Sequence, residues 1–163
     1  MNVAFERDAQ KEEWLTPRGV IDALAPFDLD PCASVIQPWP TAAKKYTIED
    51  NGLIKPWSGM VWCNPPYGTQ TQKWFRRLAE HGNGIALTFA RTETRMFFDS
   101  VWSRATALLF LKGRLSFCDT TGKPGGTAGA PSVLIAYGDE AARRLRGCKL
   151  AGAYVQLQKG CVQ

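Results

Sequence analysis

The chain is organised around the stretch GMVWCNPPYG, residues 59–68, which decides both the fold and the candidate site. Residues 60–63 are apolar and predict a short buried strand. A stiff turn follows, because the two prolines have a fixed φ, and their carbonyls are free to accept other hydrogen bonds. Asn64 precedes a proline, so an extended backbone holds its amide at the end of the strand. Open α/β sheets bind ligands at the carboxyl ends of their strands, which makes this turn the first candidate site.

The residues of this turn suit an amino group attached to an aromatic ring. Such a nitrogen is a poor nucleophile, because its lone pair is delocalised into the ring. The Asn64 side-chain oxygen and the Pro65 carbonyl are two acceptors that can bind its hydrogens and draw it towards a tetrahedral geometry. Tyr67 supplies a ring that can stack on the heterocycle, as expected for a base taken out of a duplex. The stretch resembles motif IV of the amino-methyltransferases, which act on adenine N6, cytosine N4 or a glutamine amide.

The composition indicates one ordinary globular domain without a metal. The chain has 163 residues, of which 45% are hydrophobic and 21% are charged. Its five cysteines show no CxxC spacing and its one histidine, His81, stands alone, which argues against a zinc site and a disulfide framework. No apolar run reaches membrane length and the first residues do not resemble a signal peptide, so we expect a cytoplasmic protein with no membrane partner.

The charge of the chain is divided unevenly. Residues 1–63 carry 6 basic and 9 acidic side chains, a net of −3, whereas residues 64–163 carry 14 and 6, a net of +8. A basic second half indicates a polyanionic partner such as nucleic acid, although such an excess can also serve solubility alone. The candidate DNA-binding residues are the cations near predicted strand ends or loops: Arg91, Arg95, Lys112, Arg114 and Lys123.

Strand and helix patterns alternate along the chain. Helices are predicted over residues 17–25, 69–81, 96–102 and 139–146. Strands are predicted over residues 27–30, 46–48, 60–63, 85–90, 107–111, 132–137 and 150–157. This alternation predicts an α/β fold, with an open, mostly parallel sheet flanked by helices. We expect a polar N-terminal segment over residues 1–13 and a single compact domain over residues 14–163.

Three local features carry further expectations. Thr16 is expected to cap the helix that begins at Pro17 with its side-chain oxygen. Asp30 ends a predicted strand, where it suits a ligand that carries an ammonium group, although a carboxylate that only caps the next turn has the same pattern. Residues 119–131, DTTGKPGGTAGAP, predict a mobile loop, with a lid or a DNA-contacting loop as the alternative.

The motifs follow one another in the order of a known family. Along the chain come WLTP (14–17), FDLDPCAS (27–34), DNGL (50–53) with Trp57, NPPY (64–67), ARTET (90–94) and KGRLSF (112–117). This ordered set resembles the phage-type (Dam-like) DNA N-6-adenine-methyltransferase family over about residues 14–137. The resemblance implies a Rossmann-like class I methyltransferase fold, S-adenosylmethionine as methyl donor without a metal, and double-stranded DNA as partner. We further expect a monomer, located in the host cytoplasm if the chain is phage-encoded.

The resemblance also implies roles for single residues. The catalytic residues that hold the target base are Asn64, Pro65, Pro66 and Tyr67. The cofactor-binding residues are Trp14, Thr16, Asp30, Pro31, Asp50 and Asn64, and Glu49 competes with Asp50 for the contact to the adenosine.

The sequence departs from the wider superfamily in lacking a glycine-rich motif I, since Ser34 stands where a glycine is common. Little of the chain is left for a separate target-recognition domain. Selectivity for a DNA site would therefore come from the short loops over residues 69–72, 91–95 and 112–130.

Other functions fit the same residues. An amino-methyltransferase acting on cytosine N4 or on a protein glutamine amide shares the motif at residues 64–67, and a non-catalytic nucleic-acid-binding module could retain the scaffold. The motif could also be only a Pro-rich turn or an exposed polyproline ligand, although the apolar residues 61–63 argue against an exposed ligand. The basic second half and the motif at residues 14–17 favour DNA.

Overall fold

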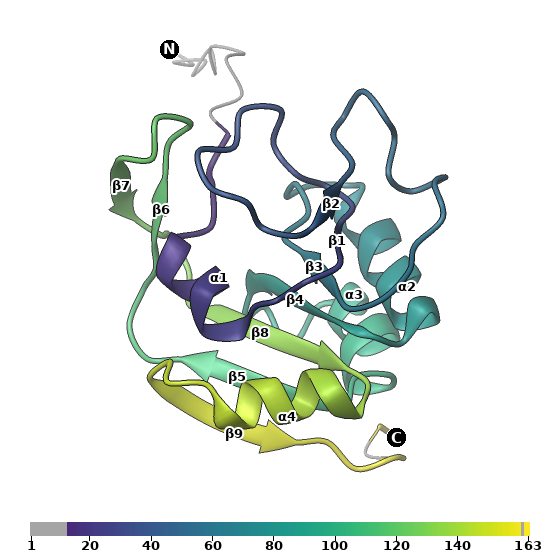
Figure 1. The fold of residues 1–163 in the computed structure, drawn as a ribbon. Coiled ribbons are helices and arrows are strands. Elements are labelled where there is room, and N and C mark those ends of the chain that lie inside the picture. The colour runs from purple at the N-terminus through teal and green to yellow at the C-terminus, as the bar shows by residue number, and fades with distance from the viewer. Residues whose placement is uncertain (1–12, 161) are drawn as a thin grey trace, which may run out of the picture.

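A seven-stranded sheet runs through the centre of the computed structural model, which describes residues 13–160 and 162–163 (Figure 1). The predicted polar segment therefore lies outside the described residues, apart from Glu13. In spatial order the strands are β2 (Lys44–Lys45), β1 (Leu29–Asp30), β3 (Val61–Cys63), β4 (Gly84–Phe89), β8 (Ser132–Tyr137), β5 (Ala107–Leu111) and β9 (Gly152–Gln156).

Five of these seven strands run in the same direction. The pairs β2–β1, β1–β3 and β3–β4 are parallel, whereas β8 lies antiparallel between β4 and β5. β5 therefore has the direction of β4, and β8 and β9 are the two reversed strands. The prediction of a mostly parallel α/β sheet is confirmed at this level. The carboxyl ends of β1, β3, β4 and β5 meet at one edge, which we call the carboxyl edge.

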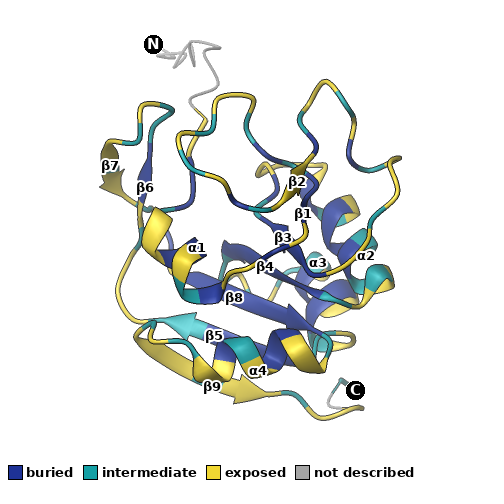
Figure 2. Cartoon of the chain, in the orientation of Figure 1, coloured by how far each residue is buried: buried dark blue, intermediate teal, exposed yellow. Residues whose placement is uncertain are grey.

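Helices cover both faces of the sheet. α1 (Arg18–Leu24) and α4 (Asp139–Gly147) pack on one face, and α2 (Thr71–His81), α3 (Arg95–Phe97) and the π-helical turn η1 (Phe98–Trp102) pack on the other. Trp62 and Leu87 point to the first face, and their neighbours Val61 and Ala86 point to the second. Because both faces are covered, β4 and β8 are buried along almost their whole length (Figure 2). The chain is a single α/β domain.

Several predicted elements are confirmed with their end signals. α2 ends at Gly82, which has a φ of 73° and donates its N–H to the Leu78 carbonyl, so this position favours glycine. α4 contains an ion pair between Glu140 and Arg144, at 3.1 Å. No helix in the described part of the chain is long and apolar enough to cross a membrane.

The strand predicted over residues 46–48 is wrong. The ladder with β1 comprises Lys44 and Lys45 instead, and a turn follows Tyr46. In this turn the Asp50 Oδ2 atom accepts the Thr47 backbone N–H at 2.8 Å. This local acceptor competes with the sheet for the backbone, so the chain leaves the ladder before residue 47.

The loop predicted over residues 119–131 is also wrong in part, because residues 124–127 form a strand. Most of it belongs to a hairpin of β6 (Ser116–Cys118) and β7 (Pro124–Thr127). Asp119 Oδ1 accepts the backbone N–H groups of Thr121 and Lys123 at 2.9 and 3.1 Å, which closes the turn. Figure 1 shows the hairpin beside the N-terminal segment that leads into α1.

Candidate active site

The candidate site lies at the carboxyl ends of β1 and β3, two neighbouring strands whose following loops run in opposite directions. The chain leaves β1 towards β2 on one side and returns to β3 on the other, so the sheet has a topological switch point between β1 and β3. A crevice outside the carboxyl ends of two such strands is the usual ligand site of an open α/β sheet. The Sγ atoms of Cys32 and Cys63 are 3.8 Å apart, so the loop after β1 contacts the end of β3 here. This hydrogen bond and burial raise the pKa of the Cys32 thiol, which therefore stays protonated.

The Asn64 amide is held at the end of β3 by one side chain from outside the sheet. Its Nδ2 atom donates to Thr16 Oγ1 at 3.0 Å. Its Oδ1 atom is buried and has no hydrogen-bond partner within the described structure. A buried acceptor without a partner costs about 1–3 kcal/mol, so this oxygen is available to a ligand that donates a hydrogen bond.

Thr16 does not cap α1, contrary to the prediction. The helix begins at Arg18, Pro17 occupies the cap position, and no side-chain capping bond forms. The Thr16 side chain is only 4% exposed and accepts the hydrogen bond from Asn64 instead. A partner far along the sequence has replaced the local backbone N–H.

The ring of Tyr67 stacks on the ring of Phe89, at the carboxyl end of β4. The ring centroids are 4.6 Å apart and the planes differ by 9°. Tyr67 remains 49% exposed, so a second flat ring can reach it. Desolvation raises the pKa of the Tyr67 phenol to about 12, which keeps it neutral. Phe89 was not singled out in the sequence, and its place at the end of a strand is the only signal that marks it.

The two proline carbonyls are not equivalent. Thr71 donates its hydroxyl to the Pro66 carbonyl at 2.8 Å, so the expectation that both carbonyls are free is wrong for Pro66. No hydrogen bond to the Pro65 carbonyl occurs among residues 13–160. Of the two, Pro65 is the acceptor left beside Asn64.

Asp30 lies at the carboxyl end of β1, the strand next to β3, and is almost fully buried. Its Oδ1 atom accepts the Cys32 N–H at 3.1 Å, and its Oδ2 atom accepts the Thr41 hydroxyl at 2.5 Å. Burial raises the pKa of this carboxyl group from 3.8 to about 6. In this arrangement Asp30 holds the loop after β1 through both oxygens, and only 3% of the residue is exposed.

The raised pKa of Asp30 predicts that stability depends on pH. A carboxyl group whose folded pKa is raised from 3.8 to about 6 stabilises the fold fully below pH 4, and this contribution is lost as pH rises towards 6. The loss amounts to about 3 kcal/mol, at 1.36 kcal/mol per pKa unit. Asp30→Asn should flatten the pH dependence of the free energy of unfolding between about pH 4 and 6. Denaturant titrations at several pH values measure this, with Asp22→Asn on the exposed face of α1 as control. Equal pH slopes in wild type and Asp30→Asn would contradict it.

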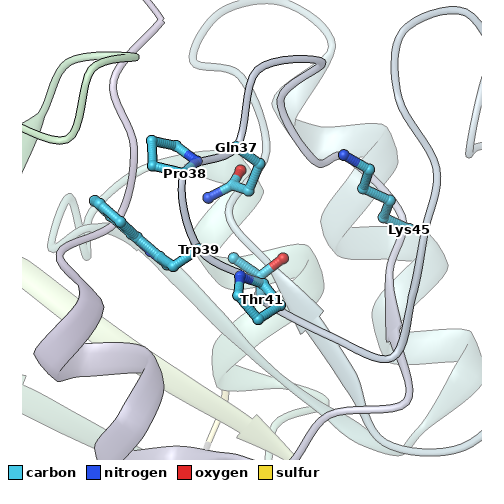
Figure 3. A pocket seen from close by; sticks show the side chains of 6 residues that line it. Gln37, Pro38, Trp39, Thr41 and Lys45 are labelled. Carbon is cyan, nitrogen blue, oxygen red and sulfur yellow. The ribbon is translucent and has the colours of Figure 1, made fainter.

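A cavity of about 280 Å³ lies in the loop between β1 and β2 (Figure 3). It is lined by Gln37, Pro38, Trp39, Pro40, Thr41 and Lys45. Thr41 links its wall to the Asp30 carboxylate, and Lys45 reaches towards it from β2. A smaller cavity of about 190 Å³ lies beside His81 at the end of α2, at the opposite edge of the sheet from Asn64.

Trp14 and Asp50, both predicted to bind a cofactor, also lie towards the carboxyl edge. Trp14 packs on the β6–β7 hairpin, where a Cβ atom on Gly125 would come within 2.2 Å of its ring. Asp50 lies in the turn after β2, and β2 is parallel to β1. Its Oδ2 atom accepts the Thr47 N–H, and its neighbour Glu49 is exposed.

No group of three His, Cys, Asp or Glu side chains that could hold a metal occurs in the described part of the chain.

The five predicted DNA-binding cations are all exposed, and most follow strands that end at the carboxyl edge. Arg91 follows β4, and Lys112 and Arg114 follow β5. Lys123 lies in the turn of the β6–β7 hairpin. Arg95 forms an exposed ion pair with Asp99 at 3.3 Å, so its charge is partly balanced.

Comparison with known proteins identifies a family. A family model described as DNA N-6-adenine-methyltransferase (Dam) matches residues 5–145, which is most of the chain. Neither a curated protein nor a solved structure matches the chain.

Proposed function

The chain belongs to the DNA N-6-adenine-methyltransferase (Dam) family, and from this premise we propose that it transfers a methyl group from S-adenosylmethionine to adenine N6 in DNA. Family membership implies the activity on DNA adenine. The observation that carries the proposal is the buried Asn64 Oδ1 atom at the end of β3, which has no hydrogen-bond partner among the described residues. We further propose that residues 14–163 form one Rossmann-like class I methyltransferase domain that acts as a monomer, which the five parallel strands and the switch point support.

The chemistry needs the amino nitrogen to become a nucleophile. When bound, S-adenosylmethionine supplies a methyl group on a sulfonium: the N6–carbon bond forms as the carbon–sulfur bond breaks, sulfur keeps the electron pair, and N6 loses one proton to water. Asn64 Oδ1 and the Pro65 carbonyl accept the two N6 hydrogens, which localises the nitrogen lone pair. Acceptors fixed in place before the reaction stabilise the charge that develops on N6 at no reorganisation cost.

Tyr67 holds the flipped base by stacking. One face of the Tyr67 ring stacks on Phe89, with 4.6 Å between the ring centroids. The target adenine therefore stacks on the other face. A pair of stacked rings limits rotation of Tyr67 and keeps the base plane aligned with the Asn64 amide.

The donor is placed at the carboxyl ends of β1 and β3, where an open α/β sheet usually binds its ligand. The orphaned acceptor of Asn64 lies at the end of β3, and the loop after β1 contains Pro31 and the cavity. Because both Asp30 oxygens are used inside the protein, Asp30 shapes the loop that receives the donor. Trp14 and Asp50 approach from the hairpin and from the turn after β2.

Analysis of the methylated product tests the proposal. Purified protein is incubated with unmethylated DNA and donor that carries a labelled methyl group, and the DNA is digested to nucleosides for mass analysis. We expect the label as N6-methyladenine. Label as N4-methylcytosine, or only on protein, would overturn the substrate assignment. Donor binding without any transfer would favour a non-catalytic module.

Asp50 is expected to bind the donor, and its charge can be removed without losing the turn. Asp50→Asn keeps a side-chain acceptor for the Thr47 N–H, which Asp50→Ala would lose. A hydrogen bond to a charged group is worth about 1.5–3 kcal/mol, so Asp50→Asn should weaken donor binding about tenfold or more. Titration calorimetry measures the Kd, with Glu49→Gln as the matched control. The reverse ranking would assign the contact to Glu49.

Binding to DNA is expected to weaken steeply with salt. Each phosphate neutralised contributes about −0.9 to the slope of log K against log salt. Arg114→Ala should make this slope shallower by about 0.9, the contribution of one phosphate contact. A change of site preference would instead mark a contact to a base. Arg104→Ala is the control, because Arg104 is exposed just before β5, at the opposite edge of the sheet. A binding constant that does not change with salt would contradict the placement of DNA at the carboxyl edge.

A further inference from the structure

The hydrogen bond between Thr16 and Asn64 joins residues 48 positions apart in the sequence. We propose that Thr16 is a positioning residue, which orients the Asn64 amide so that its oxygen faces the target amino group. The inference rests on the proposed function. It assigns Thr16 a role through Asn64, in place of a contact to the donor.

The orientation of this amide decides whether it can act. The two ends of an Asn side chain have nearly the same shape, but one accepts hydrogen bonds and the other donates them. The terminal torsion of Asn is broad and roughly two-fold, so the backbone of a turn does not select one end. A base amino group donates, and it would meet a second donor if Nδ2 pointed towards it. A separate group has to select the productive orientation.

In the structure, Thr16 holds the amide with its Nδ2 end towards the Thr16 hydroxyl. Its Oγ1 atom accepts from Nδ2 at 3.0 Å, and Oδ1 is then the end without a partner. Thr16 is 4% exposed, so water does not compete for the hydroxyl. A ligand gains the full hydrogen bond to Oδ1, because no protein donor has to be displaced from that oxygen.

The hydroxyl is itself held by the β6–β7 hairpin. Leu15 donates its N–H to the Cys118 carbonyl at 2.7 Å and accepts the Cys118 N–H at 2.9 Å. On the other side of Thr16, Pro17 has a φ of −54° and leads into α1. The backbone on both sides of Thr16 is therefore held in place. Through the bridge between Leu15 and Cys118, the hairpin positions Thr16, and Thr16 in turn positions the Asn64 amide.

Two substitutions separate a positioning role from a donor contact. Thr16→Val keeps the shape but removes the acceptor, and Thr16→Ser keeps the acceptor. We expect Thr16→Val to lower kcat about tenfold, the effect of one hydrogen bond to a neutral partner, with the donor Kd changed less than about twofold. Thr16→Ser should restore kcat to near the wild-type value. Thr106→Val is the matched control, since the Thr106 hydroxyl accepts the Gly138 N–H at 2.9 Å, at the edge of the sheet opposite Asn64.

The same variants define the results that overturn the inference. A Thr16→Val protein with a wild-type kcat would overturn it, as would a weakened donor Kd with an unchanged kcat, because the hydroxyl would then bind the donor. In the Asn64→Ala background, Thr16→Val should add no further loss, since the group that Thr16 orients is gone. A full additional loss would show that Thr16 acts on its own.

A measurement that needs no activity completes the test. In ¹⁵N-labelled wild-type protein, the side-chain NH₂ signals of Asn64 are identified by their absence in Asn64→Ala. We expect one of the two hydrogens to exchange slowly with solvent, in the wild type and in Thr16→Ser but not in Thr16→Val. Fast exchange of both hydrogens in the wild type would overturn the inference even if adenine is methylated. Absence of N6-methyladenine from the wild-type reaction would instead refute the proposed function and leave this readout unaffected.

Discussion

Replacement of Asn64 by alanine is expected to reduce the rate of methyl transfer to adenine about 10²–10³-fold, the cost of losing one preorganised transition-state hydrogen bond. The substitution removes the buried Oδ1 acceptor and leaves the loop after β1 and the basic residues in place. The loss should appear in kcat, with donor and DNA binding nearly unchanged. Transfer of a labelled methyl group to DNA, followed by nucleoside analysis, measures it.

Two comparisons sharpen the Asn64 result. Asn83→Ala at the start of β4, the opposite edge of the sheet, is the matched Asn→Ala control and should retain full activity. Asn64→Asp keeps an acceptor oxygen but loses the donor to Thr16, so its rate should fall between those of wild type and Asn64→Ala. A fully active Asn64→Ala enzyme would refute the mechanism.

Replacement of Tyr67 by alanine is expected to cost about 1–3 kcal/mol of base stacking, which corresponds to a roughly 5- to 150-fold loss in kcat/KM for DNA. The ring supplies this energy, so Tyr67→Phe should lose much less. Because the pKa of the phenol is raised to about 12, Tyr67 does not ionise under ordinary assay conditions, and both proteins should show the same pH–rate profile.

The stack with Phe89 adds a second expectation for Tyr67. Phe89→Leu keeps an apolar side chain at the end of β4 but removes the flat support, so it should weaken DNA turnover in the same direction as Tyr67→Ala and to a smaller extent. Tyr154→Ala on the edge strand β9 is the control for losing a tyrosine far from the site. An equally large loss in Tyr67→Phe and Tyr67→Ala would show that the hydroxyl, and not the ring, is required.

Local sequence was sufficient wherever a pattern had one structural solution. The apolar run before Asn64 and the two prolines after it predicted β3 and its turn. The apolar run at residues 85–90 predicted a strand, and β4 forms there, covered by helices on both sides. Hydrophobic periodicity and backbone restriction act over a few residues, so they are visible without tertiary contacts.

Local sequence was insufficient where a polar group could choose between partners. The Thr16 side chain was predicted to cap the helix that follows it, but it accepts a hydrogen bond from the Asn64 amide instead. Residues 119–131 have the composition of a loop, yet most of them belong to a hairpin on which Trp14 packs and to which Leu15 is bridged at Cys118. In each case the deciding partner belongs to a segment brought close only by the folded sheet.

The sequence by itself therefore determined the alternation of strands and helices, the family and the residues of the turn at the end of β3. The tertiary structure decided what those residues can do. It brings Thr16 to the Asn64 amide so that one oxygen remains without a partner, it places Phe89 under Tyr67, and it uses both oxygens of Asp30 to hold a loop. The physical reason is that the residue type determines which chemical groups a side chain carries. Its hydrogen-bond partners and its exposure to water depend on which distant segments pack against it.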